Sequence, residues 1–174
     1  MNGERLRLMR VGPLDLAPLD SLAARLARRL RLSCDVLEET IDASFAHEPR
    51  RGQYHSTALL DVLARTHGER GRLLAVTEHD LFVPILTFVY GEAQLGGPCA
   101  IVSMHRLREE FYGLPAREDV LQDRLEKEAV HELGHTFGLR HCMDWRCVMA
   151  SNHAIDRVDL KSAGFCAACR KLIA

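Results

Sequence analysis

The sequence predicts an α/β fold, in which helices pack against a mixed and mostly parallel β-sheet. Short apolar runs alternate along the chain with segments whose apolar residues recur at helical spacing. This alternation is typical of sheets covered by helices. The residues after position 141 differ from the rest, because four of the six cysteines lie there. We therefore expect one domain with a small C-terminal segment of distinct character.

The strands are predicted from apolar runs that are too short for helices. The runs RLLAVT at 72–77 and AIVSM at 100–104 are apolar over most of their length. Such runs are typical of central strands that are buried on both faces. The predicted strands cover residues 6–11, 33–37, 72–77, 86–92 and 100–104.

The helices are predicted from apolar residues that recur every three or four positions. In the first helix, leucines and one alanine form such a stripe between Leu19 and Leu30. Arg25, Arg28 and Arg29 lie opposite this stripe, so we expect them to face solvent. The predicted helices cover residues 19–30, 57–64 and about 117–137.

The last predicted helix carries the pattern H-E-x-x-H-x-x-G-x-x-H at residues 131–141. On a helix, His131 and His135 lie only about 40° apart, so both imidazoles can reach one metal ion. Gly138 can adopt positive φ, which ends the helix and lets His141 approach as a third ligand. Three protein ligands leave the fourth position of a tetrahedral zinc open for water, as in catalytic sites. Glu132 can stand beside that water as a general base.

A second cluster begins at the next residue. Cys142 and Cys147 form C-x4-C, and Cys166 and Cys169 form C-x2-C after eighteen intervening residues. Two close pairs joined by a loop match the spacing of a structural zinc site with four thiolates. Two disulfides, redox chemistry and four reduced core cysteines are the alternatives.

Two strings of residues resemble the archaemetzincins, a branch of the metzincin zinc peptidases. They are HELGHTFGLRHCMDWRCVM at 131–149 and FCAACRKL at 165–172. The family pattern runs the long zinc motif into C-x4-C-x-M and places C-x-x-C about seventeen residues later. Here sixteen residues separate Met149 from Cys166, a difference that a loop absorbs. Residues 75–91 are also similar to that family.

The resemblance implies a metzincin-like zincin domain with an active-site helix and a small zinc-stapled C-terminal segment. Residues 1–174 would form a single metallopeptidase domain, with a zincin-like core at 1–141 and the Met-turn and four-cysteine segment at 142–174. Met149 would lie at the Met-turn beneath the metal. The segment 86–92 would be the edge strand over the cleft, where an extended peptide can add.

The resemblance also implies the ligands of two Zn²⁺ ions per chain. His131, His135 and His141 would hold the catalytic zinc, with Glu132 as base. Cys142, Cys147, Cys166 and Cys169 would hold the structural zinc.

The expected activity is hydrolysis of peptide bonds. Zinc lowers the pKa of its bound water toward ~7, and Glu132 takes the proton as the water attacks the carbonyl. The resemblance suggests peptide substrates cleaved from the amino end, that is, aminopeptidase-like activity on small peptides.

Three alternatives compete with a peptidase of the archaemetzincin type. A metal-dependent endoribonuclease of the ribosomal-RNA maturation type shares the histidine spacing, but it lacks a glutamate such as Glu132 and the cysteines. A zinc-finger protease acting at DNA would normally carry a more basic C-terminal module. A catalytically silent zinc scaffold is the third.

Composition fits a compact cytoplasmic enzyme. The 174 residues include 23 basic and 24 acidic side chains. The nearly balanced charge does not favour binding to nucleic acid or to membrane surfaces. The N-terminus lacks the apolar stretch of a signal peptide, and no run approaches the ~20 apolar residues of a membrane span. We expect a monomer with a peptide or protein substrate as its partner.

Overall fold

The structure, a computed structural model, describes residues 5–173. Residues 1–4, at the N-terminus for which no signal peptide was predicted, lie outside the described residues. In the part of the chain that the structure describes, no helix is both long and apolar enough to cross a membrane.

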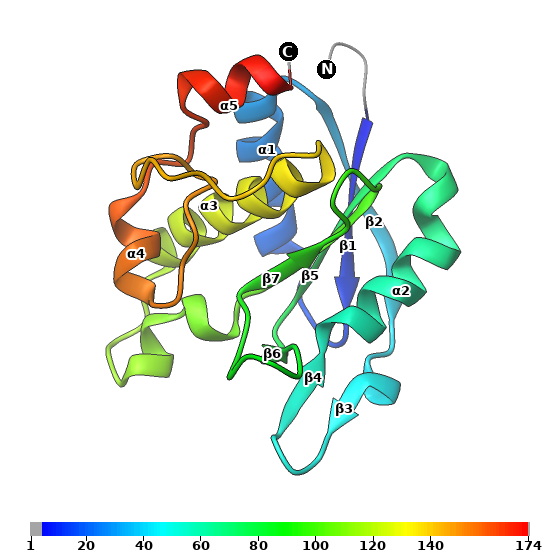
Figure 1. Ribbon diagram of the computed structural model, residues 1–174. Helices are drawn as coiled ribbons and strands as arrows, with labels where there is room; N and C mark the ends of the chain where they lie inside the picture. The colour runs from blue at the N-terminus through cyan, green and yellow to red at the C-terminus, as the bar shows by residue number, and fades with distance from the viewer. Residues whose placement is uncertain (1–4, 174) are drawn as a thin grey trace.

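A five-stranded sheet forms the centre of the molecule (Figure 1). Its strands lie in the order β2-β1-β5-β8-β7, and all neighbours are parallel except β7 and β8. Nearly every residue of β5 and β8 is buried, as their apolar sequences predict. This confirms the predicted mixed, mostly parallel sheet. The strands are β1 (Arg5–Val11), β2 (Ser33–Ile41), β5 (Arg72–Thr77), β7 (Gly91–Ala93) and β8 (Cys99–Ser103).

Helices cover both faces of this sheet. The helices α1 (Ala17–Leu30) and α3 (Glu118–Thr136) share one apolar core with Leu74 and Val76. Helix α2 (Ser56–His67) packs in a second core with Leu73 and Ala75. Consecutive residues of β5 thus point to opposite faces, which is the period-two alternation of a strand.

Smaller elements complete the fold. A second sheet contains β3, antiparallel to β4, and β6, parallel to β4. Its strands are β3 (His47–Glu48), β4 (Gln53–His55) and β6 (Leu81–Phe82). Four 3₁₀ helices are η1 (Ser44–Ala46), η2 (Gly68–Arg70), η3 (His105–Leu107) and η4 (Glu109–Tyr112). The C-terminal segment adds α4 (Ile155–Leu160) and α5 (Ala167–Leu172).

The edge strand is shorter than the sequence predicts. We expected residues 86–92 to be extended, but only Gly91–Ala93 pairs with β8. The reason is that Leu86 and Thr87 direct their carbonyls to the guanidinium of Arg51, at 2.8 and 2.9 Å. The residues from Val83 to Tyr90 therefore form a loop that leads into β7.

The predicted solvent-facing arginines are partly a contact between helices. Arg25 and Arg29 of α1 both donate to the carboxylate of Glu126 on α3, at 3.0 and 2.9 Å. The Glu126 side chain is only 7% exposed. Arg29 is exposed, as predicted, and Arg25 is half-buried. Their shared contact with Glu126 was not predicted, because the sequence does not show that α3 lies beside this face of α1.

Candidate active site

The end of helix α3 sets the geometry of the histidine motif. Gly138 adopts φ of +88°, the left-handed conformation that glycine tolerates best. Its N–H donates to His135, and that of Leu139 donates to Gly134, at 2.9 and 3.0 Å. This pair of bonds is a Schellman motif, which caps the helix and reverses the chain. The reversal brings His141 back to the helix.

The structure brings the three predicted histidine ligands together. One ring nitrogen of each of His131, His135 and His141 lies within 4.8 Å of the others. The Nε2 atoms of His131 and His135 are 3.2 Å apart. A tetrahedral zinc with Zn–N bonds near 2.05 Å would separate two such nitrogens by about 3.3 Å. The spacing of these two nitrogens therefore fits a shared zinc ion.

Hydrogen bonds at the other ring nitrogens support the same conclusion. His131 donates from Nδ1 to the carbonyl of Val148, and His135 donates from Nδ1 to that of Leu139, both at 2.7 Å. With a proton on Nδ1, a neutral imidazole presents a lone pair at Nε2. Burial lowers the pKa of all three histidines, and that of His131 falls well below its usual value. Burial thus favours the neutral form of the three rings, which is the form that binds metal ions.

Glu132 lies directly beneath the edge strand. Its side chain is buried, and burial, with the nearby Glu128, raises its pKa well above the usual value. A Cβ atom added at Gly91 would stand 2.7 Å from Glu132 Cγ and 2.6 Å from the Ile101 carbonyl oxygen. Only glycine therefore allows β7 to lie so close to this carboxylate. The need for glycine at this position cannot be recognised from the residues around Gly91 alone.

Met149 packs against the active-site helix, where the Met-turn was expected. It is fully buried, and a Cβ atom at Gly134 would stand only 2.3 Å from its sulfur. Gly134 lies between the two helical histidines in the sequence. The methionine thus occupies the space left by the missing side chain.

The four predicted cysteine ligands also converge. Their sulfur atoms lie within 4.8 Å of one another, and none of the four is in a disulfide. The distances from Cys142 to Cys166 and from Cys147 to Cys169 are both 3.8 Å. Four Zn–S bonds of 2.3 Å in a tetrahedron give S···S distances of about 3.8 Å. The backbone N–H of Cys169 lowers the pKa of the Cys166 thiol to about 7, which favours the thiolate that zinc binds.

An open cavity of about 560 Å³ lies against the histidines. Its walls are the segment 86–93, one face of α3 and the segment 151–153. His131, His135 and His141 line it together with Glu132. A ligand in this cavity can therefore reach both the metal position and the carboxylate.

A buried ion pair beside the cavity was not predicted. Lys161 donates to Glu128 at 2.8 Å, with side-chain exposures of 0% and 3%. Asn152 of the cavity wall donates to the same carboxylate at 2.9 Å. These residues lie far apart in the sequence and follow no motif, so sequence reasoning had no signal for them.

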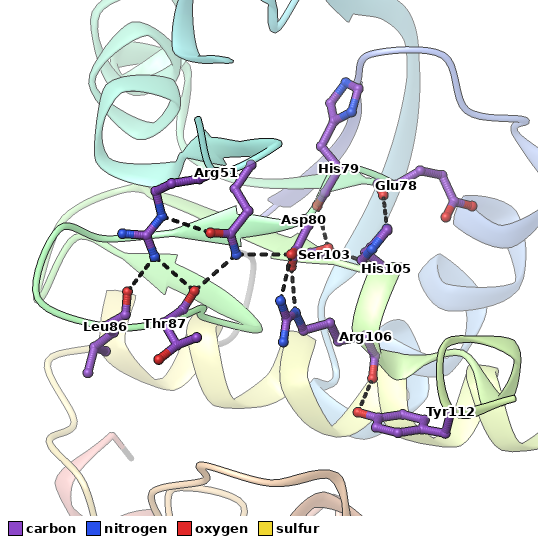
Figure 2. A network of polar contacts seen from close by, with 11 residues as sticks. Arg51, Glu78, His79, Asp80, Leu86, Thr87, Ser103, His105, Arg106 and Tyr112 are labelled. Atoms are coloured by element: carbon purple, nitrogen blue, oxygen red, sulfur yellow. Dashed lines mark hydrogen bonds and ion pairs between the residues drawn. The ribbon is translucent and has the colours of Figure 1, made fainter. Parts of the chain in front are cut away.

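The opposite wall of the cavity is held by the polar network in Figure 2. Asp80 accepts two hydrogen bonds from Arg106, at 2.7 and 2.8 Å, and one from Gln53 at 2.9 Å. Gln53 also donates to the Thr87 carbonyl at 3.0 Å, beside the contacts of Arg51 with that loop. The loop before β7 is thus fixed by side chains.

Comparisons with known proteins identify the family of this chain. The model of peptidase family M54 matches residues 22–174. The archaemetzincin of Methanocaldococcus jannaschii is 44% identical over 138 residues, which cover 79% of this chain and 75% of the relative. That of Methanopyrus kandleri is 44% identical over 128 residues, covering 74% of this chain and 70% of the relative.

Solved structures show the same similarity. The archaemetzincin of Archaeoglobus fulgidus in complex with malonate has a TM-score of 0.84 at 32% identity, covering 97% of this chain and 99% of that chain. A zinc-dependent peptidase from Methanocorpusculum labreanum has a TM-score of 0.84 at 27% identity, covering 97% and 100%. The chain therefore belongs to peptidase family M54, the archaemetzincins, and is a zinc metallopeptidase.

Proposed function

We propose that this protein hydrolyses peptide bonds at the histidine cluster, with His131, His135 and His141 holding zinc and Glu132 acting as general base. The observation that carries the proposal is the convergence of neutral imidazole nitrogens beside a buried carboxylate in an open cavity. These groups match the two requirements of metal-assisted hydrolysis, a ligand set with an open position and a base nearby.

Each group has a defined part in this reaction. When bound, zinc supplies a Lewis acid that polarises a carbonyl and makes water nucleophilic near neutral pH. Glu132 accepts a proton from the attacking water and passes it to the leaving amine. Because its carboxylate is buried, its proton transfers take place away from bulk solvent. The carbonyls of Val148 and Leu139 keep two of the imidazoles in the ligating tautomer.

An extended peptide can bind along β7. The Tyr90 carbonyl accepts from Ser103, and the Gln94 N–H donates to Cys99, so both groups point toward β8. In an antiparallel pair the backbone groups of alternate residues point the other way. Those of Gly91 and Ala93 therefore point to the free edge, where a substrate strand can add.

We propose small peptides, cleaved near the amino end, as the substrates. A free amino terminus is best held by a carboxylate, and besides Glu132 and the ion-paired Glu128 the cavity is lined by Glu92. Paired peptides with free and acetylated amino ends test this mode. Faster cleavage of the free peptides supports it, and equal cleavage indicates an endopeptidase.

Substitutions at the site test the general-base role. Glu132→Gln should retain zinc and lose hydrolysis, whereas His135→Ala should lose both. Glu69→Gln, at an exposed position far from the motif in the sequence, is the control. Peptide and RNA libraries, each with and without chelator, identify the substrate class. A glutamine variant as active as the parent would exclude Glu132 as base, and RNA cleavage without peptide cleavage would favour the endoribonuclease alternative.

We also propose two zinc ions per chain and a single functional domain. The fit of the sulfur distances to a tetrahedral zinc supports the second ion. The packing of Met149 and Val148 against α3 supports treating residues 1–141 and 142–174 as one unit.

A further inference from the structure

Lys161 holds an unusual position for a lysine. It follows α4 directly, and its side chain has no exposed surface. Its ammonium makes two polar contacts. One is the ion pair with Glu128 on α3 at 2.8 Å, and the other is a hydrogen bond to the Val148 carbonyl at 3.1 Å. Lys161 thus joins the C-terminal segment to the active-site helix.

The Val148 carbonyl is also the acceptor for His131. It receives the Nδ1 proton of His131 at 2.7 Å and the ammonium proton of Lys161 at 3.1 Å. A carbonyl oxygen has two lone pairs, so these two donors complete its hydrogen bonding. The position of Lys161 therefore fixes the group that orients the His131 ring.

We propose that Lys161 is a positioning residue for the zinc site: through the Val148 carbonyl it holds His131 in its ligating tautomer and orientation. This inference rests on the proposed role of His131 as a zinc ligand. Glu128 holds the ammonium in place and also accepts a hydrogen bond from Asn152 of the cavity wall. These contacts therefore connect His131 and the cavity wall at Asn152 to one buried charge, the ammonium of Lys161.

A purely stabilising role explains the lysine less well. A buried ion pair often contributes no more to stability than apolar side chains of similar volume, because both charges lose their hydration. An apolar residue at position 161 could fill the same space, but it could not donate to a carbonyl. Mutation of the groups that orient a metal-binding histidine through its second nitrogen typically lowers metal affinity or activity by 10- to 100-fold.

Lys161→Met tests the proposal, with Lys127→Met as the matched control. Lys127 of α3 is also buried; it forms an ion pair with Asp123 of the same helix at 2.8 Å and donates to the Asp159 carbonyl of α4 at 3.1 Å. Among the hydrogen bonds of the described residues, none joins Lys127 to the Val148 carbonyl. If the single variant does not fold, a double variant, Glu128→Gln with Lys161→Met, replaces it. The double variant removes both charges and leaves no unpaired carboxylate.

Two measurements report on the histidine site without activity. Titration with Co²⁺ separates the sites, because four thiolates give intense charge-transfer absorption and three histidines give only weak bands. Nitrogen NMR of the zinc-loaded protein detects the Nδ1 proton of His131. We expect Lys161→Met, or the double variant, to bind Co²⁺ at the histidines about tenfold more weakly and to shift or broaden the His131 signal. Lys127→Met should change neither.

The outcomes separate this inference from the proposed function. If the parent binds no Co²⁺ at the histidines, the proposed metal site itself is wrong, and the inference with it. If the parent binds but Lys161→Met and the double variant bind equally well with an unchanged His131 signal, Lys161 does not position the ligand. A lower melting temperature in both lysine variants with unchanged Co²⁺ affinity would show a structural role only.

Discussion

At the scale of single residues, the site combines buried groups whose neutral forms are favoured. Burial lowers the pKa of His131 and raises that of Glu132. A divalent cation bound to the histidines changes this balance, because it needs neutral imidazoles and stabilises a nearby carboxylate. Neutral histidines and an ionised Glu132 are therefore favoured together only when a metal ion is bound.

The pKa shift of Glu132 predicts a pH-dependent effect of Glu132→Gln in protein stripped of metal at the histidines. The folded-state pKa lies well above 4.5. The stabilising contribution of the protonated carboxyl is therefore complete below pH 4.5 and is lost as the pH rises through the folded-state pKa. Glutamine cannot ionise, so its stability advantage over the parent should grow with rising pH. Urea unfolding at a series of pH values measures it, and a pH-independent difference would contradict the prediction.

Gly134 provides a second test at this scale. Alanine in place of glycine inside a helix normally stabilises by about 0.5–1 kcal/mol. Here its Cβ would stand 2.3 Å from the Met149 sulfur and 3.1 Å from a ring carbon of Phe165. We expect Gly134→Ala to destabilise instead, by about 1–3 kcal/mol, because the core is overpacked. The penalty should shrink in a Met149→Ala background, and stabilisation by Gly134→Ala alone would show that the methionine moves freely.

At the scale of elements, the cavity is lined by one helix and by segments that side chains hold in place. The loop between β6 and β7 has no sheet partner along most of its length. Instead, Arg51 and Gln53 donate to its carbonyls, and Asp80 accepts hydrogen bonds from both Gln53 and Arg106 (Figure 2). The shape of the cavity wall that this loop forms therefore depends on long polar side chains.

This arrangement predicts a binding defect for Arg51→Met. The variant loses both hydrogen bonds to the carbonyls of Leu86 and Thr87. We expect KM for peptides to rise severalfold while zinc content stays the same, since Arg51 contacts no proposed metal ligand. Arg50→Met, at the exposed neighbouring position, is the control. Steady-state kinetics and metal analysis of both variants decide the matter, and equal KM values would mean that the loop holds its shape without Arg51.

At the scale of the whole molecule, the histidine cluster and the cysteine cluster share a short stretch of backbone. His141 is followed directly by Cys142, and Cys147 is followed by Val148 and Met149. The Cys142 N–H donates to the Met149 carbonyl at 2.9 Å. The four-cysteine segment therefore supports the third histidine and the methionine at the same time.

Cys166→Ser should therefore disturb more than the tail. The segment buries few large apolar side chains, chiefly Val148, Met149, Val158 and Phe165, while Trp145 and Leu172 remain exposed. Thiolate ligation can contribute on the order of 10 kcal/mol in small zinc modules, so its loss should lower the melting temperature and the solubility. Metal analysis should find one zinc fewer per chain. If no zinc is lost, the four-cysteine assignment is wrong. Cys34→Ser, at a cysteine outside the cluster, is the control.

The sequence by itself determined the features that depend on local spacing. A helix places His131 beside His135 wherever it lies, and Gly138 permits the turn that returns the chain. The central strands were recognised because burial on both faces requires continuous apolar runs. The positions of the four cysteines were equally readable, since short C-x4-C and C-x2-C pairs are close in any fold.

Only the tertiary structure decided which distant residues meet. The Lys161–Glu128 pair, the need for glycine at Gly91 and the contact of Arg25 with Glu126 each depend on how separate elements pack. The loop before β7 was predicted as a strand because its sequence is apolar. In the structure its carbonyls at Leu86 and Thr87 accept hydrogen bonds from the side chain of Arg51 instead of from a neighbouring strand. The physical reason is the same in each case: hydrogen bonds and close packing act over a few ångströms of space, whatever the separation along the chain.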